Sequence, residues 1–229
     1  MDLEDKIRES YHCKKFSYST QKYPFKNLVE EIFGVPLGDL HKWIGEYNVF
    51  NRDNDQNTIL HKVFYSNFNN KLKEIYNDFI NNQVKEYLKE DFYYQKIPTF
   101  RVGLPGNKFV GEFHKDSQYN HKGYEINFNL GLSNYLGKAA LKVQKERYSN
   151  DYIYLECPYG EIFSFDHINC IHGSETNVTD ITMVSFDFRI ALKRFYYDSD
   201  AKSIGNQSSF NRGFYFSDEP VNASHKKNI

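Results

Sequence analysis

The sequence predicts a mainly β protein of the α+β class, a jelly roll or double-sheet β-barrel with helices on its outside. A change of pattern near residue 92 is the main evidence. Before it, apolar residues recur at helical spacing. From residue 93 the chain runs in short segments of period two, broken by Pro, Gly and Asn. Roughly eight short strands after a helical block are typical of this architecture.

The length of 229 residues suits one sizeable domain. We expect three parts within it: a helical N-terminal layer over 1–92, a β core over 93–198, and a polar tail over 199–229. The tail either folds over the mouth of a cavity as a lid or is partly disordered.

Two stretches predict the helices. PFKNLVEEIFG (24–34) has Leu28, Val29, Ile32 and Phe33 at amphipathic spacing, and Gly34 stands where a helix would end. A longer stripe over 58–92 has apolar residues at positions 72, 75, 76, 79, 80, 84 and 88. We interpret that stripe as a helix face that packs on the core.

The predicted strands cover 93–103, 108–114, 124–132, 139–147, 151–157, 161–166, 169–174 and 181–192. Two of them alternate clearly: YEINFNLGL (124–132) and ITMVSFDFRI (181–190) each have one apolar and one polar face. In a jelly roll the apolar face can pack under the helices while the polar face lines a cavity. Asn127, Asn129 and Ser185 would then point into that cavity.

The composition indicates which kinds of binding partner and which cellular compartment to expect. The formal net charge of -1 argues against nucleic acid as the main partner. No run of 18 apolar residues occurs, so no membrane span is expected. Three cysteines without a CxxC pair favour a reducing cytoplasm over a disulfide framework. We expect a monomer or homodimer.

A metal site is predicted from three residues. His114 and Asp116 form an HxD pair, and residues i and i+2 of an extended strand point to the same side. His172 lies on or beside a late strand and supplies a second imidazole. Two histidines and one carboxylate leave open positions on an octahedral ion, as non-haem Fe(II) requires for a cosubstrate and O2. Arg189, on the polar face of a late strand, is a candidate for binding a carboxylate.

Two segments carry a family resemblance. FRVGLPGNKFVGEFHKDSQYNHKGYEINFNLGLSNYLG (100–137) and GEIFSFDHINCIHGSETNVTDITMVSFDFRI (160–190) resemble the Fe(II)/2-oxoglutarate-dependent oxygenase superfamily. Within it, they are similar to a subgroup associated with streptomycin biosynthesis and related to phytanoyl-CoA hydroxylases. The resemblance implies a double-stranded β-helix (cupin-like jelly roll) that uses Fe(II), 2-oxoglutarate and O2. It also implies hydroxylation or a related oxidation, with release of succinate and CO2.

By this resemblance, His114, Asp116 and His172 match the iron triad, and Arg189 is the candidate for the 2-oxoglutarate carboxylate. The chain departs from the pattern at Met183, because many relatives have an arginine two residues before the serine of this strand. The intact Asp116 favours hydroxylation over halogenation. Desaturation, ring formation and epimerisation remain open.

Substrate contacts are expected just beyond the HxD pair, where Gln118, Tyr119, Asn120 and His121 would form the rim of the pocket. A polar cavity suggests a small polar substrate such as a sugar, cyclitol, amino acid or nucleoside derivative. Two other functions use the same pattern: a cupin-like metal enzyme without redox chemistry, such as an isomerase, and a binding module with a decayed metal site.

Two further pairs of residues suggest other roles. Cys170 and His172 suggest a thiol nucleophile with its base, but no carboxylate that would orient the base is evident. His167 beside Asp166 is interpreted as a turn pair.

Overall fold

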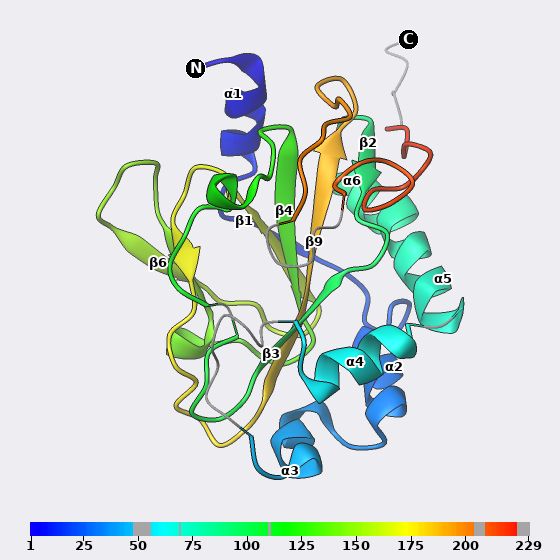
Figure 1. The fold of residues 1–229 in the computed structure, drawn as a ribbon, viewed down its shortest axis with the longest axis vertical. Coiled ribbons are helices and arrows are strands. Elements are labelled where there is room, and N and C mark those ends of the chain that lie inside the picture. The colour runs from blue at the N-terminus through cyan, green and yellow to red at the C-terminus, as the bar shows by residue number, and fades with distance from the viewer. Residues whose placement is uncertain (48–55, 69, 110, 204–208, 224–229) are drawn as a thin grey trace.

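A computed structural model describes residues 1–47, 56–68, 70–109, 111–203 and 209–223. Part of the predicted strand 108–114 and part of the predicted tail lie outside these residues. The described elements form two antiparallel sheets with helices on one side, and the strands do not close into a barrel (Figure 1). The expected jelly-roll class is confirmed in this open form.

The larger sheet has the strand order β1-β7-β4-β9-β2, with β3 also paired to β9. Its strands are Lys14–Ser17 (β1), Glu161–Phe165 (β7), Glu125–Gly131 (β4), Met183–Leu192 (β9), Phe92–Tyr94 (β2) and Thr99–Gly103 (β3). The smaller sheet has the order β6-β5-β8, from Tyr152–Leu155 (β6), Leu141–Gln144 (β5) and His172–Gly173 (β8). All the pairings between these strands are antiparallel.

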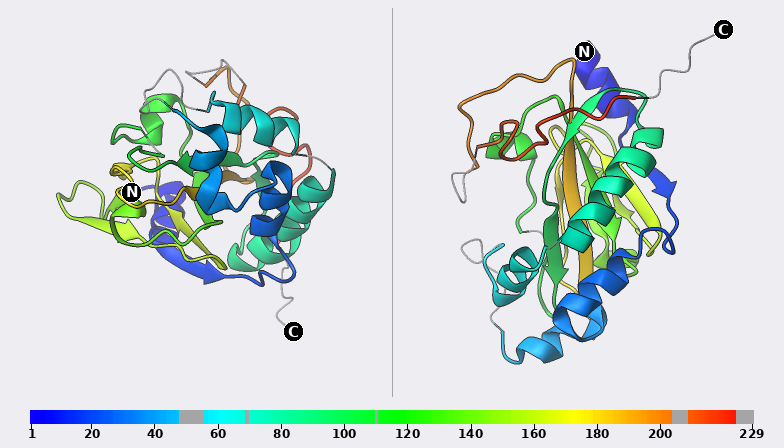
Figure 2. Two further views of the ribbon diagram at one scale, coloured as in Figure 1. Left: turned by 90° about the horizontal axis from the view of Figure 1, so that it is seen from below. Right: turned by 90° about the vertical axis from the view of Figure 1, so that its right-hand side faces the viewer.

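The first helix, Leu3–Ser10 (α1), lies at one end of the larger sheet. The helices between residues 25 and 87 cover one face of that sheet, as the right-hand view of Figure 2 shows. Their bounds are Phe25–Phe33 (α2), Leu40–Ile44 (α3), Ile59–Ser66 (α4), Asn70–Asp78 (α5) and Lys85–Tyr87 (α6). Phe25, Phe64 and Phe79 from these segments share one buried cluster with Phe186 and Phe188 of β9. The apolar face of the alternating strands therefore packs under the helices, as predicted.

The predicted end of α2 is confirmed at Gly34. Its backbone is left-handed, with φ of 69°, and its N–H donates to the carbonyl of Glu30. Glycine adopts this conformation without steric cost and commonly ends helices. Gly131 in β4 has a different reason to lack a side chain, because an added Cβ would lie 2.5 Å from the carbonyl oxygen of Cys157.

Three expectations about the elements need correction. The stripe over 58–92 is not one helix: α4 ends at Ser66, and α5 passes through a π-helical stretch, Phe79–Val84, into α6. The N-terminal layer contains a strand, β1, which pairs with β7. Of the predicted strand 108–114, the described residues show only an isolated bridge between His114 and His172. The chain there turns at Pro105–Gly106, and Asn107 pairs with Asn177 instead.

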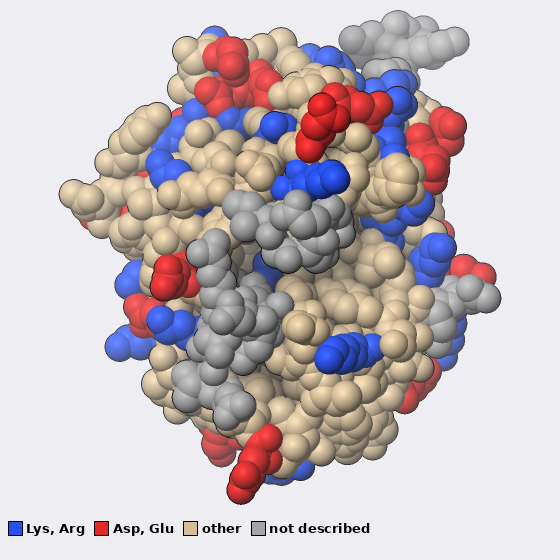
Figure 3. Space-filling model, viewed as in Figure 1, with Lys and Arg blue, Asp and Glu red and all other residues tan. Residues whose placement is uncertain are grey.

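Charges of both signs are scattered around the edge of the face in Figure 3, with uncharged residues between them. This agrees with the net charge of -1. Within the described residues, none of the helices has the length and apolar character needed to cross a bilayer.

Candidate active site

A cavity lies between the two sheets. Its walls come from β3, β4, β7 and β9 on one side and from β5 and β8 on the other. The lining residues are Arg101, His114, Asp116, Asn127, Asn129, Leu141, Phe165, His172, Asp187 and Arg189. The polar faces of β4 and β9 therefore point into this cavity, as their alternation predicts.

The structure brings His114, Asp116 and His172 together. Nε2 of His114 lies 3.1 Å from Oδ1 of Asp116, and Nε2 of His172 lies 3.3 Å from the same oxygen. Ligands about 2.1 Å from an ion and at right angles to each other are ~3.0 Å apart. Each Nε2 is thus spaced from Oδ1 of Asp116 like a neighbouring ligand of one octahedral ion, and the three donor atoms all lie within 4.8 Å of one another. The main-chain bridge between His114 and His172 holds the two imidazoles side by side.

The backbone orients both imidazoles. Nδ1 of His114 lies 2.6 Å from the carbonyl oxygen of Glu112, and Nδ1 of His172 lies 3.1 Å from that of Cys170. A carbonyl only accepts hydrogen bonds, so Nδ1 carries a proton in both rings, and Nε2 is the nitrogen of each ring that can ligate an ion. Asp116 begins a short 3-10 helix, Asp116–Tyr119, and does not continue a strand from His114. His114 and Asp116 point to the same side, as predicted, but the start of a 3-10 helix brings them there in place of an extended strand.

Arg189 forms an ion pair with the other oxygen of Asp116. Its Nη2 lies 2.5 Å from Oδ2, and both side chains are buried. Burial by itself would raise the pKa of Asp116. The Arg189 guanidinium, followed by His114 and His172, holds the pKa well below its usual range. Asp116 is therefore ionised, with Oδ1 directed at the imidazoles and Oδ2 bonded to Arg189.

A second group of possible ligands lies beside the first: His121, Glu125 and His167. Its carboxylate is already occupied. Oε1 of Glu125 accepts the N–H of Lys122, and Oε2 lies 2.7 Å from Nδ1 of His121 and 3.9 Å from Nε of Arg189. Asp116, in contrast, keeps one oxygen for an ion. The first group is therefore the better candidate for holding an ion, and Glu125 is a second counter-charge for Arg189.

Comparison with known proteins identifies the family. StrG of Streptomyces griseus, a streptomycin biosynthesis protein, is 30% identical to this chain over 202 residues. The match covers 88% of the chain and 96% of StrG. The chain belongs to the StrG family. The expected subgroup, associated with streptomycin biosynthesis, is thereby confirmed. No protein-family model matches the sequence.

One solved structure supports the fold of this StrG-family chain. The non-heme monooxygenase ThoJ in its apo form has a TM-score of 0.53 at 12% identity, covering 84% of this chain and 78% of ThoJ. At this identity the match shows a shared fold. The 2-oxoglutarate-dependent carbocyclase SnoK from nogalamycin biosynthesis has a TM-score of 0.47 at 10% identity, covering 83% of this chain and 84% of SnoK.

The remaining predicted residues of the StrG-family chain lie around the triad. Nδ2 of Asn129 donates to Oγ of Ser185 at 3.4 Å, which places Ser185 beside the cavity wall. Tyr119 packs edge-on against the ring of His114, with 4.9 Å between centroids. Gln118 is exposed and accepts the N–H of Lys115. His121 faces Glu125 and the ring of Phe210. Neither Gln118 nor His121 belongs to the described cavity lining.

Three residues of the site were missed from the sequence: Arg101, Glu125 and His167. His167 lies in a turn after Asp166, as interpreted from the sequence, but it is also fully buried, and its Nε2 lies 4.0 Å from Oδ2 of Asp116. Asp166 pairs with Arg8 and Arg147. A signal for Arg101 was present, since it alternates with Phe100 and Val102 and so shares the polar face of a predicted strand.

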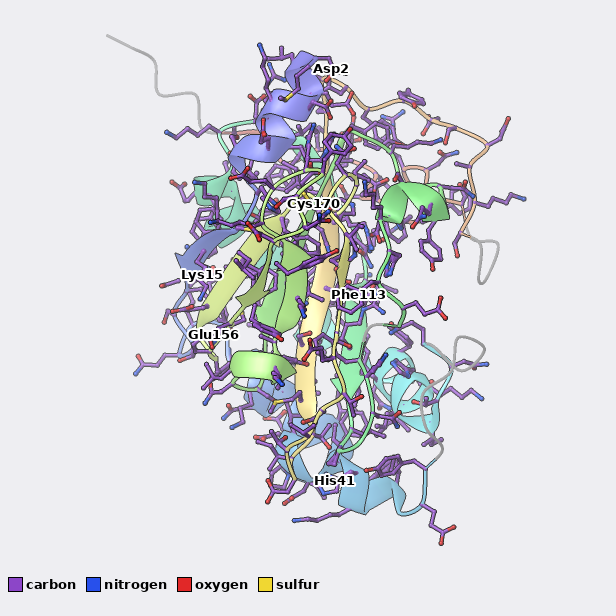
Figure 4. All side chains as sticks on the ribbon, turned by 90° about the vertical axis from the view of Figure 1, so that its left-hand side faces the viewer. Asp2, Lys15, His41, Phe113, Glu156 and Cys170 are labelled. Atoms are coloured by element: carbon purple, nitrogen blue, oxygen red, sulfur yellow. The ribbon has the colours of Figure 1, made fainter. Side chains whose placement is uncertain are left out.

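A thiol nucleophile at Cys170 is not supported. Burial raises the pKa of the Cys170 thiol to about 12, so the thiol is not ionised near neutral pH. Cys170, labelled in Figure 4, is buried near the strands, far from His41 in the helices at the other end of the molecule. The carbonyl of Cys170 orients His172, which gives this residue a structural role.

The described part of the C-terminal tail packs against the site. Phe216 forms an isolated bridge with Gln95, and Val221 one with Phe92. The hydroxyl of Tyr215 accepts a hydrogen bond from Nη1 of Arg189 at 3.1 Å and donates to Gln95. Tail residues thus help to fix Arg189 from the side opposite β4.

Proposed function

We propose that this StrG-family chain is an Fe(II)- and 2-oxoglutarate-dependent oxygenase that hydroxylates, or otherwise oxidises, a small polar molecule. The observation that carries the proposal is the set of two imidazole Nε2 atoms and one ionised carboxylate oxygen that face a cavity between the sheets. Such a set holds Fe(II) and leaves positions for a keto acid and O2.

In this proposal His114, Asp116 and His172 hold the iron. When bound, the iron with 2-oxoglutarate supplies the oxidising chemistry: O2 gives one oxygen atom to the substrate and one to succinate, and CO2 is released. The carbonyls of Glu112 and Cys170 keep both imidazoles in the ligating tautomer. Because Asp116 retains its carboxylate, hydroxylation is favoured over halogenation.

Other lining residues divide into polar and apolar groups. Asn127 and Asn129, together with Ser185 beside them, offer hydrogen bonds to cosubstrate and substrate. Leu141 and Phe165 supply apolar wall, which helps to keep water from the reacting atoms. Tyr119, against the ring of His114, is the best placed of the rim residues for a substrate contact. Gln118 and His121 are proposed as outer contacts.

The substrate class follows from the cavity and the family. The polar lining suits a sugar, cyclitol, amino acid or nucleoside derivative, and the name of StrG connects the family to the biosynthesis of a small molecule. No nucleic-acid or membrane partner is proposed. A cytoplasmic location and a monomeric or homodimeric state remain predictions.

The decisive experiment is an anaerobic titration. Fe(II) is added to the purified protein, followed by 2-oxoglutarate, and the visible charge-transfer band of the chelate is recorded. We expect a band in the wild type and none in His114→Ala. Fe(II) binding without a band would contradict the proposal and favour a non-redox, cupin-like enzyme such as an isomerase. No Fe(II) binding at all would leave a binding module.

A further inference from the structure

The C-terminal segment 209–223, which we call the C-terminal strap, runs beside β2 (Figure 1). Phe92 of β2 and Val221 of the strap exchange two main-chain hydrogen bonds, and Phe216 of the strap forms a bridge to the residue after β2. Phe216 is also fully buried. The strap is therefore docked on the larger sheet, and Tyr215, next to Phe216, is held in a fixed place.

The hydroxyl of Tyr215 lies between Arg189 and Gln95, 3.1 Å from Nη1 of the first and 2.9 Å from Oε1 of the second. The amide of Gln95 has a defined orientation, because its Nε2 donates to the carbonyl of Ile97 at 2.7 Å. Its Oε1 can therefore only accept, so the single hydroxyl proton of Tyr215 points at Gln95. The oxygen of Tyr215 is left to accept the hydrogen bond from Arg189.

The guanidinium of Arg189 is held at two points. Nη1 donates to Tyr215, and Nη2 donates to Oδ2 of Asp116. The third nitrogen, Nε, is buried and makes no hydrogen bond within the residues that the structure describes; its closest acidic oxygen, on Glu125, is 3.9 Å away. Without the Tyr215 hydroxyl, one hydrogen bond would remain to fix the plane of the guanidinium.

The orientation of the Asp116 carboxylate depends on this guanidinium. A carboxylate is planar, so the bond that fixes Oδ2 also fixes Oδ1, which faces the two imidazoles. Hydrogen-bond partners of ligating groups set the orientation of the ligand and tune the affinity for the metal. A chain of hydrogen bonds thus leads from the strap, through Tyr215 and Arg189, to Asp116.

We propose that Tyr215 is a positioning residue of the metal site: it holds Arg189, and through Arg189 it sets the orientation of the Asp116 carboxylate toward the ion. The inference rests on the proposed function, since it takes Asp116 as an iron ligand. It makes the docked C-terminal strap a part of the metal site, although the strap supplies no ligand.

The test uses the metal alone, so that no keto acid enters the measurement. Tyr215→Phe removes the hydroxyl and keeps the ring, which packs against the rings of Phe210 and Phe216. We expect the Kd for Fe(II), measured without O2, to rise roughly 3- to 10-fold. The effect should be smaller than that of removing a direct partner of a ligand, because Arg189 stands between Tyr215 and Asp116.

A spectroscopic measurement distinguishes positioning from stability. Co(II) is bound in place of Fe(II), and its visible ligand-field bands, which depend on the arrangement of the ligands, are compared between Tyr215→Phe and the wild type. We expect the bands of the variant to shift or to change in intensity. A residue that only stabilises the fold would lower Tm and leave the bands unchanged.

Tyr94→Phe is the matched control. It also removes one tyrosine hydroxyl near the strap, but that hydroxyl donates to Asn77 at 3.1 Å and is not part of the chain to Asp116. Its Kd for Fe(II) should stay within about twofold of the wild type. In an Arg189→Lys background, Tyr215→Phe should have no further effect, because the guanidinium that connects the two residues is gone.

Three results would overturn the positioning role: an unchanged Kd and Co(II) spectrum in Tyr215→Phe, an equal change in Tyr94→Phe, or the full effect of Tyr215→Phe in the Arg189→Lys background. Failure of the proposed function gives a different result. The Fe(II) affinity would then depend on Tyr215 as expected, while the Fe(II)-loaded wild type would show no band with 2-oxoglutarate.

Discussion

At the scale of single residues, Asp116 links metal binding to buried charge. One oxygen faces the two imidazoles and the other is bonded to Arg189, while Glu125 lies 3.9 Å from the same guanidinium. A buried ion pair contributes little beyond its desolvation cost, but removing one partner leaves an uncompensated charge. The pair therefore stabilises the metal-free protein only as long as both members are present.

Asp116→Asn tests this dependence without creating a cavity. We expect the free energy of unfolding of the metal-free protein to fall by about 3 kcal/mol, because the Arg189 guanidinium loses its closest counter-charge. The measurement is urea unfolding with a chelator present. Lys22→Ala is the control: it removes an exposed ion pair with Asp78 and should cost less than about 1 kcal/mol. Equal costs for the two variants would contradict the assignment.

The sequence predicted those site residues whose type and spacing are informative by themselves. His114, Asp116 and His172 were predicted in this way, and the structure brings them together. Arg101 and Glu125 were missed because their roles depend on strand register. Only the pairing of Arg101 with Ser185, and of Glu125 with Ala191, shows which residues each one faces.

At the scale of elements, β9 has two different faces. Val184, Phe186, Phe188 and Ile190 belong to the cluster under the helices, while Asp187 and Arg189 line the cavity. Alternation predicts such a strand well, because each face has one chemical character. β1 was not predictable in the same way. It is short, only Phe16 among its residues is apolar, and its place in the sheet comes from main-chain pairing with β7.

Phe186→Ala measures how strongly the apolar face of β9 holds the helical layer. Phe186 is fully buried against Phe25 and Phe64. Truncation should lower the free energy of unfolding by about 3–5 kcal/mol, from lost burial and the cavity left behind. Phe214→Ala is the control, since Phe214 is 77% exposed and its loss should change stability by less than about 0.5 kcal/mol. Chemical denaturation gives both values, and a small loss in Phe186→Ala would show that the layer packs loosely.

Helix α1 is attached to the loop before His172 by a buried ion pair. Nε of Arg8 lies 2.8 Å from Oδ1 of Asp166, and Arg147 lies 2.7 Å from the other oxygen. Burial would raise the pKa of Asp166, but Arg8 and then Arg147 lower it below its ordinary value. The folded state therefore holds this proton less tightly than the unfolded chain. The resulting stability is present above the unfolded pKa of about 4 and is lost as the pH falls through the folded pKa.

Asp166→Asn should accordingly be less stable than the wild type at pH 7, by about 3 kcal/mol. The difference should shrink as the pH falls below about 4, because Asp166 of the unfolded chain takes up a proton there before Asp166 of the folded protein does. Urea unfolding of both proteins at pH 7 and pH 3 gives the comparison. A difference that stays constant over this range would show that the pKa of Asp166 is the same in the folded and the unfolded protein.

At the scale of the whole molecule, the site occupies the space between the two sheets, and the helices lie on the far side of the larger sheet (Figure 2). Ligands therefore bind between layers that come from distant parts of the chain. The overall arrangement was predictable because helices and strands occupy separate halves of the sequence. The break near Asn67 was not, because the apolar spacing continues through it.

Metal binding should stabilise the whole fold. An ion at 100 times its Kd adds about 2.7 kcal/mol if it binds only the folded state. For a domain of this size that corresponds to a rise in Tm of roughly 5–11 °C. Thermal unfolding with Fe(II) under anaerobic conditions, against a chelator, measures the rise. His172→Ala should show none, and an equal rise in that variant would place the metal elsewhere.

The late position of β9 in the chain also affects the order in which the larger sheet can form. β9 begins at Met183, and it pairs with β4, β2 and β3, which all precede it in the sequence. During translation, β2, β3 and β4 leave the ribosome long before the strand they need. Until then they expose apolar side chains and unpaired edges, which are prone to aggregation. These edges can be covered only after residues 183–192 have been synthesised and β9 has paired with β2, β3 and β4.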